Sequence, residues 1–119
     1  MTKPVKKFKP AQWINFAISD IKIYPKTQPQ LEYGEAKVWK NYCAFVEKEG
    51  RFPTTTDVAK LGTDHPDKAA KTWTARKLNQ LVCYGYLCSY LKGSKRKWCS
   101  FEEAERLQKA INDHSAKNN

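Results

Sequence analysis

The sequence predicts an α+β domain that is mostly helical and carries one β-hairpin. Apolar residues recur at helical spacing in several segments after Gly34. Two runs rich in aromatic residues flank a Gly-Ser pair at 93–94, which is typical of a hairpin turn. The chain has 119 residues, of which 40% are hydrophobic, so we expect one domain with a modest core.

The first part of the chain is expected to lie outside the main domain. Residues 1–9 are interpreted as a flexible basic arm, and residues 10–33 as an N-terminal helix followed by an extended connector. The helix is predicted over 9–21, with a proline near its start and Trp13 on its apolar side. Two prolines within 22–30 predict the extended connector. Four lysines of the arm either add nonspecific attraction for an anion or only keep the chain soluble: Lys3, Lys6, Lys7 and Lys9.

Residues 34–113 are expected to form the main domain. The segment 35–50 has five apolar residues on one helical face and ends at a glycine, which predicts a helix. Within 51–62, Thr54 or Thr55 can serve as the N-cap, Asp57 lies in the first turn and Gly62 is the expected stop, so we expect a second, short helix. The segment 68–84 predicts a long third helix. Four residues share its buried face: Ala70, Thr74, Leu78 and Leu81.

The hairpin and a last helix complete the predicted domain. The hairpin joins 86–91 to 97–101. The last helix is predicted over 100–113, because Ser100 and Glu103 have capping-box spacing. Residues 114–119 are polar and are expected to form a disordered tail.

Charge is unevenly distributed along the chain. The net charge is +10, and residues 68–101 contain eight basic residues and no Asp or Glu. Such a surplus indicates a polyanionic partner, with nucleic acid favoured over an anionic membrane. The sequence has neither a secretory signal nor a segment that spans a bilayer, so we expect a cytoplasmic, nucleoid-associated protein.

Three segments carry a resemblance to a known fold: FPTTTDVAKLG, TWTARKLNQLVCYGYL and LCSYLKGSKRKWCSF. Their order resembles winged helix-turn-helix regulators of the MarR and ArsR kind, whose third helix typically reads T-V-S-R-x-L-x-x-L-x-x-x-G-Y-L. The resemblance covers about residues 35–112 and implies a two-stranded β-hairpin wing with extra N- and C-terminal helices. The run TDHPDKAAKT is longer than the usual turn in these regulators, and residues 10–30 match no part of them. The matching residues of the third helix are Thr74, Ala75, Arg76, Leu78, Leu81, Gly85, Tyr86 and Leu87.

The resemblance implies a set of DNA-binding residues. On the third helix, Thr72, Arg76 and Asn79 are the residue types that reach base edges in the major groove. Lys68 and Lys71 near the start of that helix suit phosphate contacts. The hairpin tip would lie on the backbone or minor groove through Lys92, Ser94, Lys95, Arg96 and Lys97. The alternatives are an ordinary polar helix face and a solvated turn that protects an edge strand.

The leading hypothesis is a small basic protein that holds duplex DNA through residues 68–84 and 92–97. It would be a transcription regulator or nucleoid-associated factor, of a kind that phages or plasmids encode. The 10–20 and 102–112 segments are the candidates for a homodimer contact, and the sequence does not choose between a dimer and a monomer. The alternative is a protein-interaction module that docks on an acidic surface of a polymerase or defence complex. RNA binding is a third, weaker hypothesis.

The sequence indicates neither an enzyme nor a metal or cofactor site. The two histidines and the scattered acids form no catalytic pattern, and no glycine-rich phosphate loop is present. A turn centred on residues 93–94 places Cys88 opposite Cys99, close enough to consider a disulfide. A zinc site that also includes Cys43 or Cys83 is a second hypothesis. Reduced thiols in the core are favoured over the disulfide and over the zinc site.

Overall fold

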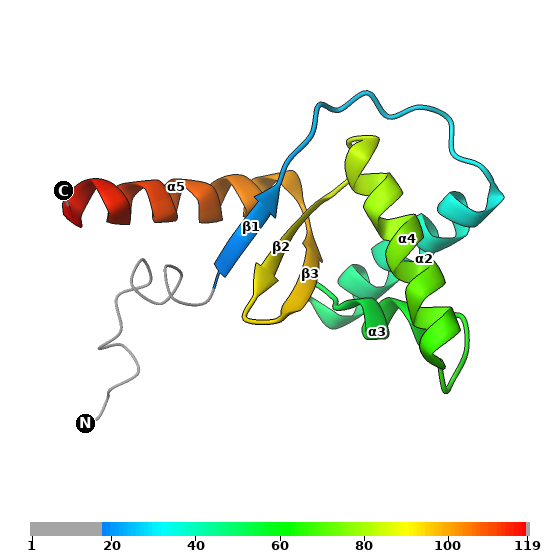
Figure 1. Cartoon of the computed structure of the whole chain (residues 1–119). Coiled ribbons are helices and arrows are strands. Elements are labelled where there is room, and N and C mark those ends of the chain that lie inside the picture. The colour runs from blue at the N-terminus through cyan, green and yellow to red at the C-terminus, as the bar shows by residue number, and fades with distance from the viewer. Residues whose placement is uncertain (1–17, 119) are drawn as a thin grey trace.

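The computed structural model describes residues 18–118, with side chains as far as residue 113. Within this range the fold is α+β, with four helices and one three-stranded antiparallel sheet (Figure 1). The predicted arm 1–9, and residues 10–17 of the predicted N-terminal helix, lie outside the described residues. The elements in chain order are β1 (Ile18–Lys22), α2 (Tyr33–Glu49), α3 (Thr55–Ala59), α4 (Lys68–Cys83), β2 (Cys88–Lys92), β3 (Lys95–Cys99) and α5 (Phe101–Asn118).

The helices predicted over 35–50, 51–62 and 68–84 are confirmed as α2, α3 and α4, although α3 ends at Ala59, before the expected stop at Gly62. The helix α2 ends at Gly50, which has a φ of 67° and donates its N–H to the Val46 carbonyl. The side chain of Thr54 caps α3 by accepting the N–H of Asp57, whose carboxylate in turn accepts the N–H of Thr54. These short-range bonds satisfy backbone groups at helix ends, so local sequence suffices to predict them.

The hairpin has the predicted register, with Cys88 paired to Cys99 and Lys92 paired to Lys95. The sheet nevertheless has a third strand, because β1 lies antiparallel to β2 and pairs Ser19 with Leu91. The predicted helix over 9–21 is therefore wrong at its C-terminal end, where residues 18–22 are extended. Pairing with the edge of the hairpin satisfies backbone groups of this segment, and this tertiary contact overrides the local helical spacing.

The sheet separates two hydrophobic clusters. Because side chains alternate along a strand, Trp98 and Cys99 point to opposite faces. Trp98 packs with residues of α2, α3 and α4, including Val38 and Leu78. Cys99 packs on the other side with Ile18 and with Ala104 and Leu107 of α5. The helices α2, α3 and α4 thus cover one face of the sheet, and α5 covers the other (Figure 1).

The connector between β1 and α2 is extended, as predicted, and it crosses the C-terminal end of α4. The Gln28 N–H donates to the Tyr84 carbonyl at 2.7 Å, and the Thr27 hydroxyl donates to the same carbonyl at 3.1 Å. Gly85 has a φ of 81°, and a Cβ atom there would lie 2.1 Å from the Pro25 carbonyl oxygen. Only glycine therefore fits at this crossing.

The last helix is longer than predicted. Its start is as expected, since the Ser100 hydroxyl accepts the Glu103 N–H at 3.1 Å. Glu103 also forms an ion pair with Arg106 one turn later. The helix continues to Asn118, past the expected end at residue 113, because the segment HSAKN contains neither a proline nor a glycine to stop it.

Candidate nucleic-acid interface

The helix α4 presents a continuous polar face to solvent. Its buried side consists of Thr74, Leu78, Leu81 and Val82, which pack against the domain core. The side chain of Asp67 caps the helix by accepting the Ala70 N–H at 2.8 Å. The five residues predicted for DNA contact on this helix are all exposed: Lys68, Lys71, Thr72, Arg76 and Asn79.

An internal ion pair fixes α4 against α2. The Lys77 ammonium lies 3.0 Å from a carboxylate oxygen of Glu35, whose side chain is only 4% exposed. The other oxygen of Glu35 accepts the Glu32 N–H at 3.2 Å, at the start of α2. Lys77 therefore neutralises a buried carboxylate and does not contribute to the exposed basic face.

The predicted hairpin residues fall into two groups. Lys92, Ser94 and Lys95 are exposed at the tip, whereas Arg96 and Lys97 are half-buried. Strand alternation explains part of this difference, because Arg96 lies on the opposite face of the sheet from its two neighbours. The five hairpin residues therefore do not form one contact surface.

Arg96 joins the hairpin to β1. Its guanidinium forms an ion pair with the Asp20 carboxylate and donates to the Asp20 carbonyl at 3.1 Å. It also donates to the hydroxyl of Ser89, which is fully buried, at 3.0 Å. The Arg96 hydrogen bond lowers the pKa of the Asp20 carboxyl. Arg96 therefore stabilises the contact between the hairpin and β1, and its charge is not freely available to a ligand.

Sequence reasoning missed Asp20 as the partner of Arg96. Asp20 has a φ of 49°, in the left-handed region, and lies where the pairing of β1 with β2 shifts register. The one available signal was that Asp20 is the only acid among the first 31 residues. That signal does not identify its partner, which lies 76 residues away.

Lys97 and its neighbour Trp98 connect the hairpin to the segment before α3. The Lys97 ammonium donates to the Phe52 carbonyl at 3.2 Å, and burial lowers its pKa. The Trp98 N–H donates to the Pro53 carbonyl at 3.1 Å, and the indole N–H donates to the Thr55 hydroxyl at the same distance. A short bridge also pairs Thr54 with Lys97. The base of the hairpin is thereby held in a fixed position beside α3.

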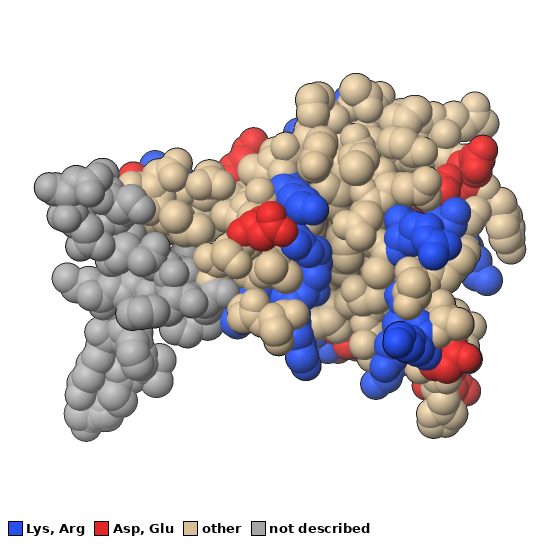
Figure 2. Space-filling model, in the orientation of Figure 1, with Lys and Arg blue, Asp and Glu red and all other residues tan. Residues whose placement is uncertain are grey.

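Basic side chains gather over two elements on one face of the molecule. Figure 2 shows one blue column over the hairpin and a second over α4, each with red side chains beside it, and mostly uncharged surface between the two columns. A hollow of about 380 Å³ separates the start of α3 from the tip of the hairpin. It is lined by Thr54, Thr55, Thr56, Asp57, Lys95 and Arg96. The exposed cations of the two columns would attract a polyanion, and the one carboxylate in the lining of the hollow, Asp57, is paired with Arg51.

The cysteines are free thiols in this structure, and Cys88 faces Cys99 across the hairpin as predicted. Burial raises the pKa of the Cys88 thiol to about 11, and it raises that of Cys99 further. Both thiols are therefore protonated at neutral pH, which makes them weak nucleophiles and weak metal ligands. No group of three or more potential metal ligands occurs among the side chains that the structure describes, residues 18–113.

Comparisons with known proteins found no match to this chain among family models, curated proteins or solved structures. Among the described helices, none is both long and apolar enough to cross a membrane.

Proposed function

We propose that this protein binds duplex DNA through the exposed face of α4 and the tip of the β2–β3 hairpin. The order of elements supports a winged-helix arrangement for this purpose. The helices α2, α3 and α4 are followed by a hairpin, and the bridge at Thr54 adds a short extended segment between α2 and α3. In such an arrangement the third helix enters the major groove and the hairpin contacts the adjacent backbone.

The observation that carries the proposal is the exposure of cations on two elements of one face, with no carboxylate between residues 68 and 101. Lys68, Lys71 and Arg76 are exposed on α4, and Lys92 and Lys95 are exposed on the hairpin. If these five cations each contact a phosphate, a plot of log affinity against log salt concentration should have a slope of about −4.5. An ordinary solvated surface predicts a much weaker dependence, because it mixes both charge signs.

Base recognition in this proposal is limited to a few side chains. The helix α4 has 16 residues, which corresponds to a length of about 24 Å. Arg76 and Asn79 are exposed one turn apart, and Thr72 lies one turn before Arg76. Arg pairs best with guanine and Asn with adenine in the major groove, so a modest sequence preference is expected. A transcription regulator or a nucleoid-associated factor fits this balance of phosphate and base contacts.

The test is the binding of a fluorescent random-sequence DNA duplex, measured by anisotropy at two salt concentrations. The variant Lys68→Ala/Lys71→Ala should lower affinity and reduce the salt slope by about 2, and Lys95→Ala should reduce it by about 1. The control is Lys40→Ala/Lys48→Ala, which removes two exposed cations from α2. The proposal fails if the wild type does not bind at low salt, or if the control weakens binding as much as the α4 variant.

A further inference from the structure

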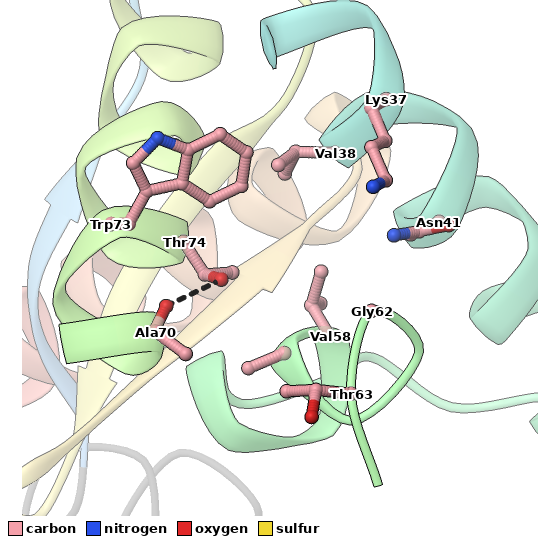
Figure 3. Close-up of a pocket in the computed structure, with 10 residues that line it drawn as sticks. Lys37, Val38, Asn41, Val58, Gly62, Thr63, Ala70, Trp73 and Thr74 are labelled. Carbon is pink, nitrogen blue, oxygen red and sulfur yellow. Dashed lines mark hydrogen bonds between the residues drawn. The ribbon is translucent and has the colours of Figure 1, made fainter. Parts of the chain in front are cut away.

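A small hollow lies at the junction of α2, α3 and α4. Its volume is about 160 Å³, and Figure 3 shows that all three helices contribute to it. Trp73 of α4 forms one wall, and Lys37 and Asn41 of α2 extend from the opposite side (Figure 3). Val38 and Val58 line the space between them.

The proposed DNA contacts do not explain this hollow. Trp73 is 40% exposed, although it is a large aromatic residue with core contacts close by. At 100° per residue it lies about 120° around the helix axis from Asn79, away from the centre of the polar face. The ammonium of Lys77 lies 5.8 Å from the centre of the indole ring and leaves it accessible. An exposed tryptophan beside a hollow is a common feature of protein-binding hot spots.

The size and lining of the hollow indicate its occupant. Pockets for drug-sized ligands and cofactors usually have about 300–1,000 Å³, so this hollow suits a single side chain better. Its lining combines apolar side chains with the polar groups of Lys37, Asn41 and Thr63, and the hydroxyl of Thr74 already donates to the Ala70 carbonyl at 2.8 Å. A nucleobase of duplex DNA is paired and stacked, so it could enter the hollow only after flipping out of the duplex, whereas an apolar side chain of a protein segment meets no such cost.

The charges at the rim of the hollow determine which partner groups are favoured next to the inserted side chain. Lys37 is exposed at the rim and forms no ion pair with the side chains described for residues 18–113. On the opposite side of the hollow, Asp64 follows Thr63, and its carboxylate would repel acidic groups of a partner. Such groups are therefore favoured only on the side of α2. The net charge of +10 attracts acidic segments from a distance.

We infer that this hollow docks an acidic segment of a partner protein, which inserts one bulky apolar side chain between Trp73 and Lys37. The carboxylates of the segment lie next to that side chain and face Lys37. This docking does not depend on DNA binding, because it uses the side of α4 and the first half of α2. The protein would then hold DNA and a partner protein on different surfaces.

The experiment is selection of peptides from a random display library on the full chain, with Trp73→Ala used for counter-selection. The selected peptides are then synthesised, and their binding is measured by fluorescence anisotropy. We expect a bulky apolar residue next to two or more carboxylates. Affinity should fall about 30-fold in Trp73→Ala and about 10-fold in Lys37→Glu. The matched control Lys40→Glu, on the same helix but outside the hollow, should change affinity much less.

Three results overturn the inference. The first is that every peptide selected by the wild type is also selected by Trp73→Ala. The second is that the selected peptides lack carboxylates or bind Lys37→Glu normally. The third is that single-stranded oligothymidylate displaces the peptide and itself requires Trp73, which would assign the hollow to a nucleobase. Thermal melting of each variant shows that the fold is intact, and the duplex DNA affinity of Trp73→Ala should stay within about 2-fold of the wild type.

Discussion

The helix α4 and the β2–β3 hairpin are both basic in sequence, but they use their cations differently. On α4, Lys68, Lys71 and Arg76 are exposed, and only Lys77 forms an internal ion pair. In the hairpin, Arg96 and Lys97 are committed to contacts with β1 and with the segment before α3. A run of basic residues therefore indicates a binding surface only where the fold leaves the charges accessible.

The largest effect is expected at Gly85, which joins α4 to the hairpin. In Gly85→Ala, the methyl group would overlap the Pro25 carbonyl, and the residue would also have to keep its positive φ. We expect a loss of more than about 3 kcal/mol in the free energy of unfolding, measured by urea denaturation. The control is Gly93→Ala in the hairpin turn, which also has a positive φ but no atom within 4 Å of the new Cβ. It should cost about 1 kcal/mol. Equal losses in the two variants would show that the crossing of the connector over Gly85 does not matter.

The second prediction compares the internal cation of α4 with an exposed cation of the same helix, by their effects on stability and on DNA binding. Lys77→Met leaves the buried Glu35 carboxylate without its partner, so we expect a loss of about 2 kcal/mol in the free energy of unfolding. The loss should be below that of a fully buried pair, because Lys77 is 22% exposed. Lys71→Met on the exposed face should change the free energy of unfolding by less than about 0.5 kcal/mol and weaken DNA binding instead. The opposite pattern, with Lys71 important for stability, would reverse the two roles.

The third prediction compares a partly buried cation with an exposed cation within the hairpin. Arg96→Ala removes the donor to the buried Ser89 hydroxyl and should cost about 1 kcal/mol in the free energy of unfolding. Lys95→Ala should leave stability nearly unchanged and should lower DNA affinity by about 3-fold at low salt. Thermal melting and DNA titration of the two variants give both quantities. If Lys95→Ala destabilises the fold and Arg96→Ala does not, the division of the hairpin cations is wrong.

The smallest effect is the pH dependence of the contact between β1 and the hairpin. The hydrogen bond from Arg96 lowers the pKa of Asp20 in the folded state. This carboxylate therefore contributes stability above its unfolded pKa, which is near 3.8, and the contribution is lost as the pH falls through the folded pKa. Asp20→Asn should make the urea midpoint depend less steeply on pH between about pH 5 and pH 3. An unchanged dependence in Asp20→Asn would mean that other carboxyl groups account for the acid sensitivity.

The sequence predicted those parts of the fold that depend on neighbouring residues. A threonine cap at position 54 or 55, the stop at Gly50 and the register of Cys88 with Cys99 all follow from residue types at fixed spacing, and the structure uses Thr54 as the cap. Segments whose structure depends on distant partners were predicted less well. The strand β1 was predicted as the end of a helix, because its pairing with β2 joins residues 67 to 74 positions apart.

The candidate site shows the same division. The sequence by itself determined the net charge, the acid-free run from residue 68 to 101 and the polar face of α4, because composition and helical period fix them. Only the tertiary structure decided that Arg96 faces Asp20, that Lys77 neutralises Glu35 and that Trp73 borders a hollow. The physical reason is that the accessibility of a charge or a ring depends on which distant groups pack against it, and local sequence does not encode those distances.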